Sequence, residues 1–138
     1  MAVALPTKIR LEIVTPERMM FSEDVDQVTL PGSEGYLGIL PGHLPLLTML
    51  GAGVLTYRQQ STKHHFAVSG GFAEVLGDRV IVLAETVERP QEIDLERARA
   101  AKQKAEKLLQ SKEQIDVQAA MADLLKATTR IQVAEMRS

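Results

Sequence analysis

The chain has 138 residues and a formal net charge of −2, with 45% hydrophobic residues and no cysteine. This length fits one ordinary domain, or a small domain with an appendage, and the lack of cysteine excludes disulfides and thiolate metal sites. Only 4% of the residues are aromatic, and the charge balance is slightly acidic, so we expect neither a base-stacking platform nor a basic footprint for nucleic acid.

The composition changes sharply at Glu88-Arg89-Pro90. Glycine and proline recur at short intervals before this point. After it neither occurs, and the strong helix formers Ala, Lys, Glu, Gln, Arg and Leu dominate. We therefore predict an α+β protein with a β domain over residues 1–88 and a helical segment over residues 89–138. The first part has six Lys/Arg and ten Asp/Glu, the second ten and eight. A mildly basic tail of this kind can seek an acidic protein surface.

Short segments of the first part alternate polar and apolar residues, as half-buried strands do. The expected strands cover residues 8–13, 25–30, 36–40, 53–58, 63–68, 72–76 and 79–83. Two hairpins are expected among them, one turning at residues 59–62 and the other at Gly77-Asp78. Many short strands with frequent turn signals predict a small β-sandwich of about ten strands.

The second part shows two narrow apolar stripes with helical spacing. Asp94 is suited to cap the first helix, because its carboxylate can accept from free backbone N–H groups. A polar stretch at residues 110–114 indicates a loop, so the pattern predicts an antiparallel two-helix hairpin. Its small seams bury little apolar area, which favours arms that can separate; an ordinary stable appendage is the alternative. The stripes are Leu95, Ala98, Ala101, Ala105 and Leu108, then Val117, Ala120, Leu124, Ala127, Ile131 and Ala134.

The motifs of common enzymes are absent: there is no GxxxxGK[ST] loop, no GxGxxG fingerprint and no GxSxG elbow. His64 and His65 are adjacent, so in a strand they point to opposite faces and cannot chelate one metal. No apolar run approaches the length of a membrane-spanning helix, and the N-terminus lacks the features of a signal or transit peptide. We expect no catalytic residues, no metal, no required cofactor and no direct membrane insertion.

Two strings, GSEGYLGILPGHLPLLT at residues 32–48 and AVSGGFAEV at residues 67–75, resemble the epsilon subunit of the F-type rotary ATP synthase. The resemblance runs from Leu11 to Met136 and implies a β-sandwich followed by a helical hairpin. It also implies a non-catalytic rotor subunit of the central stalk, which couples proton translocation to ATP synthesis and restrains ATP hydrolysis. Such a subunit would be a peripheral protein on the cytoplasmic face of the bacterial plasma membrane.

The resemblance implies several partners within the complex. One face of the sandwich would pack on the gamma subunit, and one end, with Tyr36 and His43, would face the ring of c subunits. Tyr36 stands where the family often has an acidic residue. The extended hairpin would reach the alpha and beta subunits of the catalytic head, with inhibitory contacts from Lys126, Arg130 and Arg137.

The resemblance also implies a regulatory ATP, because some bacterial members bind it through an I/L-D-x-x-R-A motif. This chain matches the motif, and the implied ATP contacts are Glu88, Ile93, Asp94, Arg97, Ala98, Lys126 and Arg130. Lys104 and Lys126 stand where the best ATP binders have arginine. Lysine lacks the bidentate fork of arginine, so phosphate recognition should weaken. In the alternative interpretation, Asp94 is a helix cap and Arg97 a surface charge.

A second class of protein also fits the patterns. It is a free-standing β-sandwich protein-binding module with a coiled-coil tail, which would self-associate through Val117, Leu124 and Ile131. A rotor subunit would instead stay monomeric when free and bind gamma one to one.

Overall fold

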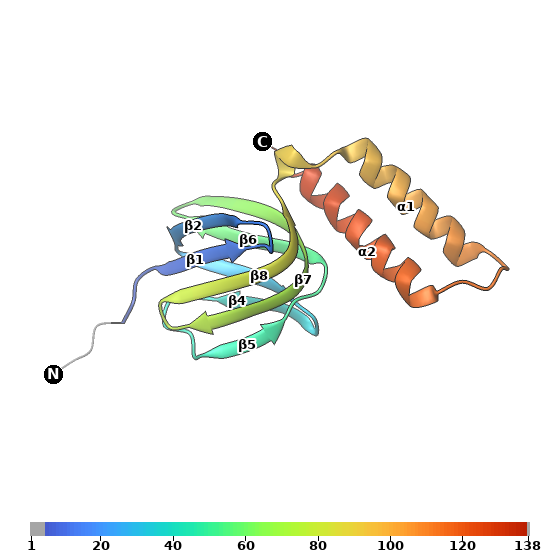
Figure 1. The fold of residues 1–138 in the computed structure, drawn as a ribbon. Helices are drawn as coiled ribbons and strands as arrows, with labels where there is room; N and C mark the ends of the chain where they lie inside the picture. Colours follow the sequence, from blue (N-terminus) through green and yellow to red (C-terminus); the bar gives the residue numbers. More distant parts are fainter. Residues whose placement is uncertain (1–4, 138) are drawn as a thin grey trace.

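The structure, a computed structural model, describes residues 5–137 and consists of a β-sandwich followed by two helices (Figure 1). The first four residues of the predicted β domain and Ser138 lie outside the described residues. The elements are β1 (Ile9–Val14), β2 (Met19–Val25), β3 (Gln27–Gly32), β4 (Gly35–Ile39), β5 (Leu46–Met49), β6 (Gly53–Gln59), β7 (Thr62–Leu76), β8 (Arg79–Glu88), the 3-10 turn η1 (Pro90–Glu92), α1 (Leu95–Gln110) and α2 (Val117–Ala134).

All eight strands belong to one hydrogen-bonded sheet that folds over itself, in the order β2-β1-β8-β7-β6-β3-β4, with β5 also paired to β7. The long strand β7 makes this possible. Its first half pairs with β6 and its second half with β5, while β8 runs along its other edge. Strands β1 and β8 pair in parallel, and the other strand pairs are antiparallel.

The core lies between the two layers of the folded sheet. Leu11, Leu30, Leu55, Val75 and Val82 are fully buried there, and they come from β1, β3, β6, β7 and β8. Alternating residues of each strand point inward, which is the period-two pattern expected from the sequence. At one end of the core three aromatic rings gather, with the Phe21 ring centroid 4.7 Å from that of Tyr57 and 5.7 Å from that of Phe66.

The predicted fold class is confirmed, but the strand list needed three corrections. The described residues form eight strands rather than about ten. Residues 63–68 and 72–76 are not separate strands, because Gly70 and Gly71, with φ of +67° and +100°, bend β7 without ending it. Residues 25–30 are not one strand either, because the chain bends at Asp26 between β2 and β3. In addition, β5 and all of β2 except Val25 lie outside the predicted strands.

The two helices begin at aspartates. The Asp94 carboxylate accepts from the Arg97 backbone N–H at 3.1 Å, which confirms the predicted cap. Asp116 does the same for α2, accepting from the Ala119 N–H at 3.0 Å. The helices pack side by side in opposite directions (Figure 1), as predicted. No helix among residues 5–137 is long and apolar enough to cross a membrane.

The predicted apolar stripes are buried only in part. Ala98 and Ala105 of the first stripe are buried, as are Ala120, Ala127 and Ala134 of the second. Leu108 and Val117, near the connection between the helices, are exposed, contrary to the expectation for stripe residues. The reason is geometric: the hairpin projects from one side of the sandwich (Figure 1), so its far end has no strand to cover it.

The hairpin is attached to the sandwich mainly through the C-terminal end of α2. Val133 and Ala134 form a small apolar cluster with Val54 of β6, Ala67 of β7 and Ile93 of the linker, residues 89–94. Helix α2 also packs on β6, β7 and η1. This cluster is separate from the sandwich core, so the two parts of the chain do not share one hydrophobic core.

Candidate functional site

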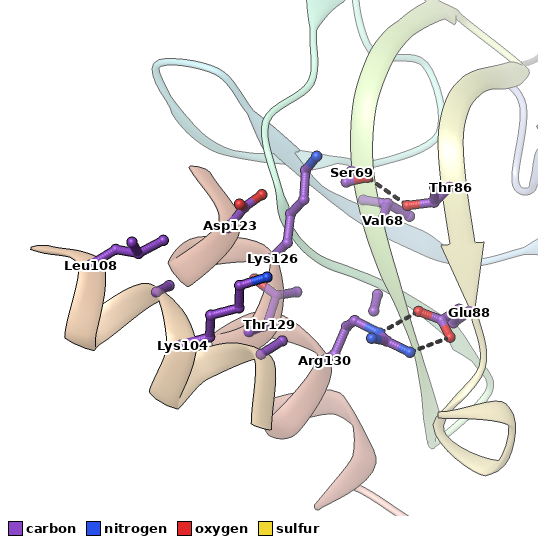
Figure 2. A pocket seen from close by; sticks show the side chains of 14 residues that line it. Val68, Ser69, Thr86, Glu88, Lys104, Leu108, Asp123, Lys126, Thr129 and Arg130 are labelled. Carbon is purple, nitrogen blue, oxygen red and sulfur yellow. Dashed lines mark hydrogen bonds and ion pairs between the residues drawn. The ribbon is translucent and has the colours of Figure 1, made fainter. Parts of the chain in front are cut away.

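A cavity of about 570 Å³ lies between the hairpin and strands β7 and β8 (Figure 2). Its strand side contains Val68 and the hydroxyls of Ser69 and Thr86, which share a hydrogen bond of 2.5 Å. Alanines of both helices line the other side, so the interior is mostly apolar. The lining residues are Ala67, Val68, Ser69, Thr86, Glu88, Ala101, Lys104, Ala105, Leu108, Asp123, Lys126, Ala127, Thr129 and Arg130.

One end of the cavity is closed by a two-point ion pair between the sandwich and α2. Arg130 donates from Nε to Glu88 Oε1 at 2.7 Å and from a terminal nitrogen to Oε2 at 3.0 Å (Figure 2). Both side chains are about three-quarters buried, at 26% and 29% exposed. A bidentate arginine–carboxylate pair is among the stronger polar contacts in proteins, so it favours the docked hairpin.

Two lysines supply the remaining positive charge of the cavity. In Figure 2, Lys104 of α1 and Lys126 of α2 project into the space between helices and strands, and Asp123 lies one turn before Lys126. Among the described residues neither lysine is in an ion pair within 4.0 Å. The arrangement can attract an anion, and it contains no nucleophile–base pair suited to catalysis.

The residues predicted to bind ATP therefore fall into two groups. Glu88, Lys126 and Arg130 line the cavity together, whereas Ile93, Asp94, Arg97 and Ala98 do not. Ile93 and Ala98 are buried, and Asp94 accepts from the backbone of Arg97, whose side chain is exposed. The start of α1 thus has clear structural roles, and a nucleotide would have to bridge from it to the cavity.

Arg137 lies away from the cavity, at the far end of α2. Its guanidinium donates to the Pro90 carbonyl oxygen at 2.9 Å and to that of Ile93 at 2.5 Å. The three predicted inhibitory cations are consequently not equivalent. Arg130 and Arg137 are engaged by the sandwich and linker, and Lys126 faces the cavity.

The two residues predicted to face the c ring lie at opposite ends of β4. Tyr36, near its start, has an oxygen that accepts from the Val54 backbone N–H at 3.0 Å. His43 lies in the following loop, where the neighbouring Gly42 N–H donates to the Gly77 carbonyl at 2.7 Å. Tyr36 therefore has a structural partner on β6, and the two side chains do not form one cluster.

An exposed apolar row crosses three strands of the sandwich. The register aligns Met49 of β5 with Phe72 of β7, and Phe72 with Leu83 of β8. Their exposed fractions are 59%, 48% and 52%. The sequence did not reveal this row, because it depends on the register of β5, β7 and β8. Contiguous exposed apolar side chains typically mark an interaction surface.

The predicted coiled-coil surface of the alternative reading is only partly available. Val117 is exposed, but Leu124 and Ile131 are half-buried within the packed hairpin. Self-association through all three residues would require the hairpin to rearrange.

The fold and site define a class: a small β-sandwich that has a helical hairpin attached through a separate apolar cluster. Residues 8–90 match the family described as ATP synthase, Delta/Epsilon chain, beta-sandwich domain, and residues 91–135 match its long alpha-helix domain. The chain therefore belongs to the ATP synthase delta/epsilon chain family, as the two sequence strings suggested.

Curated relatives agree with this assignment. The ATP synthase epsilon chain of Desulforamulus reducens is 54% identical over 127 residues, covering 91% of this chain and 96% of the relative. Those of Nitratidesulfovibrio vulgaris and Solibacter usitatus are 49% and 43% identical, covering 91% and 96% of this chain and 94% and 100% of the relatives.

Solved structures share the fold. A chain in the Euglena gracilis mitochondrial ATP synthase superposes with a TM-score of 0.84 at 24% identity, covering 96% of this chain and 84% of that one. A chain in the Tetrahymena thermophila central stalk and c-ring structure gives 0.59 at 16%, covering 94% and 96%.

Proposed function

We propose that the chain is a rotor subunit of the central stalk, which couples proton translocation to ATP synthesis and restrains ATP hydrolysis. It would work on the cytoplasmic face of a bacterial plasma membrane as a peripheral subunit. Family membership supports the assignment to the complex, and the similarity to ATP synthase epsilon chains supports the assignment to that subunit. The observation that carries the rotor role is the exposed apolar row of Met49, Phe72 and Leu83.

The proposed occupant of this row is the gamma subunit. A rotor subunit must transmit torque, and a stable attachment requires buried apolar area in its interface. The row lies on the rigid sheet rather than on a loop, so a partner bound there would move with the whole sandwich. The loop that holds His43 would then be the part that faces the c ring.

Phe72→Glu should weaken binding to purified gamma by at least about tenfold, because a central aromatic is replaced by a charge that must be desolvated. Leu125→Glu is the matched control, because Leu125 is as exposed as Phe72 but lies on α2. Gel filtration should show a one-to-one complex for the wild type and the control. Equal binding of all three proteins would contradict the docking face.

The restraint of hydrolysis would come from the hairpin, which would leave the sandwich and extend into the catalytic head. The small apolar cluster and the Glu88–Arg130 pair are the main docking contacts. Because these contacts are few, the hairpin is suited to reversible undocking. Contacts of Lys126, Arg130 and Arg137 with the alpha and beta subunits would belong to the extended state.

A charge reversal tests this restraint in the reconstituted complex. Glu88→Arg places a second cation beside Arg130 and should favour the extended state, so ATP hydrolysis should fall several-fold. The double variant Glu88→Arg/Arg130→Glu restores an opposite-charge pair and should return hydrolysis toward the wild-type rate. Arg99→Glu, at an exposed pair with Glu96, controls for surface charge. If Glu88→Arg leaves hydrolysis unchanged, docking does not control the rate.

We further propose that ATP binds between the start of α1 and the cavity and favours the docked hairpin. Lys104, Lys126 and Arg130 provide the positive charge for phosphates. Isothermal titration of ATP, with and without Mg²⁺, should show saturable binding that Arg97→Ala abolishes. If titration to millimolar ATP releases no binding heat, residues 93–98 serve only as the capped start of α1.

A further inference from the structure

Two arginines, Arg130 of α2 and Arg137 just after it, hold the same short stretch of chain. Arg130 binds the carboxylate of Glu88, the last residue of β8. Arg137, which follows α2, binds the backbone oxygens of Pro90 and Ile93 at 2.9 and 2.5 Å. The end of the chain is thereby fastened to the linker that joins the two parts of the molecule.

The two carbonyl groups are suitable acceptors because the local helices do not fully use them. Helix α1 is capped by Asp94, whose own carbonyl accepts from Ala98, so the Ile93 oxygen lies outside the helical ladder. The Pro90 oxygen has only a long bond of 3.5 Å from the Ile93 N–H. An unpaired carbonyl in a partly buried place costs free energy, so Arg137 stabilises the linker as well as α2.

The linker also has contacts with the sandwich that do not involve α2. The Arg89 guanidinium lies 5.0 Å from the Phe66 ring centroid and 5.9 Å from that of Phe21, and η1 packs on β7. Ile93 belongs to the small apolar cluster that the linker shares with both the sandwich and α2. Cation–π contacts of this geometry are favourable. The linker can therefore stay bound to the sandwich when α2 detaches from it.

We infer that Arg137 is a latch: it fastens the C-terminal end of α2 to the sandwich-bound linker and sets how readily α2 detaches while α1 remains joined at its start. The latch itself follows from the contacts above. Its effect on ATP hydrolysis rests on the proposed function.

Amide hydrogen exchange of the full-length chain tests the latch directly. A detached α2 would lose the tertiary packing that supplies most of the stability of a helix in a protein, so detachment raises its exchange. Arg137→Gln removes the charged donor and should raise exchange over residues 124–134 about fivefold. Exchange in β1 and β8, which reports unfolding of the sandwich, should not change.

Two further variants serve as controls for the exchange experiment. Arg137→Lys keeps the charge but has no fork to reach two carbonyls, so it should restore part of the protection. Arg99→Gln, on the exposed side of α1, should leave α2 exchange at the wild-type rate. Unchanged exchange of α2 in Arg137→Gln would overturn the latch, and so would an equal rise in α2 and in the sandwich strands.

The same variant separates the latch from the proposed function. In the reconstituted complex, Arg137→Gln should change the ATP hydrolysis rate if the hairpin restrains hydrolysis. Faster α2 exchange with an unchanged hydrolysis rate would keep the latch and contradict the regulatory role of the hairpin. Unchanged exchange would refute the latch whatever the hydrolysis rate.

Discussion

Asp26 is the residue that joins three separate segments at one end of the sandwich. Its carboxylate accepts from Lys8 Nζ and from the Gln60 backbone N–H at 2.6 Å, and Arg58 lies 3.8 Å away. These donors hold the pKa of Asp26 below its ordinary value of 3.8, with the Lys8 hydrogen bond as the largest cause and the Gln60 bond next. Because the folded-state pKa is lowered, the stabilisation is present above pH 3.8 and is lost as the pH falls through the folded-state value.

Asp26→Asn should therefore be less stable than the wild type at pH 7, because it loses the charge but keeps an acceptor. The difference should shrink steadily as the pH is lowered from 3.8. Urea unfolding of both proteins across this range measures it. A difference that stays constant at low pH would show that the charge of Asp26 does not contribute.

Gln60, whose N–H donates to Asp26, occupies a strained position in the turn between β6 and β7. Its φ is +58°, the one positive value found for a non-glycine residue among residues 5–137, and side chains with a Cβ rarely adopt it. Gln60→Gly should stabilise the chain by about 0.5 kcal/mol, the relief of strain exceeding the entropy that glycine adds to the unfolded state. Thermal unfolding should show a higher midpoint, and a lower one would contradict the strain.

At the level of elements, the bend in β7 depends on two glycines that are not equivalent. A Cβ on Gly71 would lie 1.9 Å from the Leu83 carbonyl oxygen, whereas one on Gly70 would meet the Glu85 side chain at 2.6 Å. A backbone oxygen in the sheet cannot move away, but a flexible glutamate can. The bend should therefore tolerate a Cβ at position 70 better than one at position 71.

Gly71→Ala should cost about 3 kcal/mol or more of unfolding free energy, and Gly70→Ala about 1 kcal/mol. Both variants carry the penalty of a positive φ, so each serves as the control for the other. Equal losses in denaturant unfolding would mean that the contact with Leu83 is relieved by a small shift of β8.

These elements also show how far the sequence could predict the fold. Alternation and turn residues located the strands near residues 8–13, 36–40, 53–58 and 79–83, because local patterns determine which residues face the core. The continuity of β7 could not be predicted, since Gly70-Gly71 is as typical of a turn as of a bend. Strand β5 was missed because its side chains Leu47 and Met49 point outward, against the usual pattern.

The candidate site was predictable only in its composition. The family resemblance implied ATP contacts at Glu88, Lys126 and Arg130, and these three residues do line one cavity. Ser69 and Thr86 were not foreseen, because their pairing depends on the register of β7 against β8. The hydrogen bonds of Arg137 to Pro90 and Ile93 span 47 and 44 positions of the sequence. No local sequence pattern predicts a contact of that range.

For the whole molecule, the two separate apolar clusters imply that the hairpin can undock while the sandwich stays folded. Val133→Asp should undock the hairpin and leave the sandwich folded, because it puts a charge into the small cluster only. Burying a carboxylate without a partner costs several kcal/mol, on the order of what so few apolar contacts supply. Gln132→Asp, on the exposed neighbour, is the control.

The measurement is amide exchange in α2 and in the sandwich of the same sample. Fast exchange in α2 with protected β1, β7 and β8 is the expected result. Loss of protection in both parts would show that the hairpin and sandwich unfold as one cooperative unit.

The parallel pairing of β1 with β8 has a consequence for biosynthesis. Arg10 lies opposite Arg79, so β1 leaves the ribosome well before β8, the strand that pairs with its second edge. Contacts that close such long loops form slowly, and until then β1 has only β2 beside it. The two helices emerge after β8, so the hairpin would dock on a sandwich whose sheet can already close.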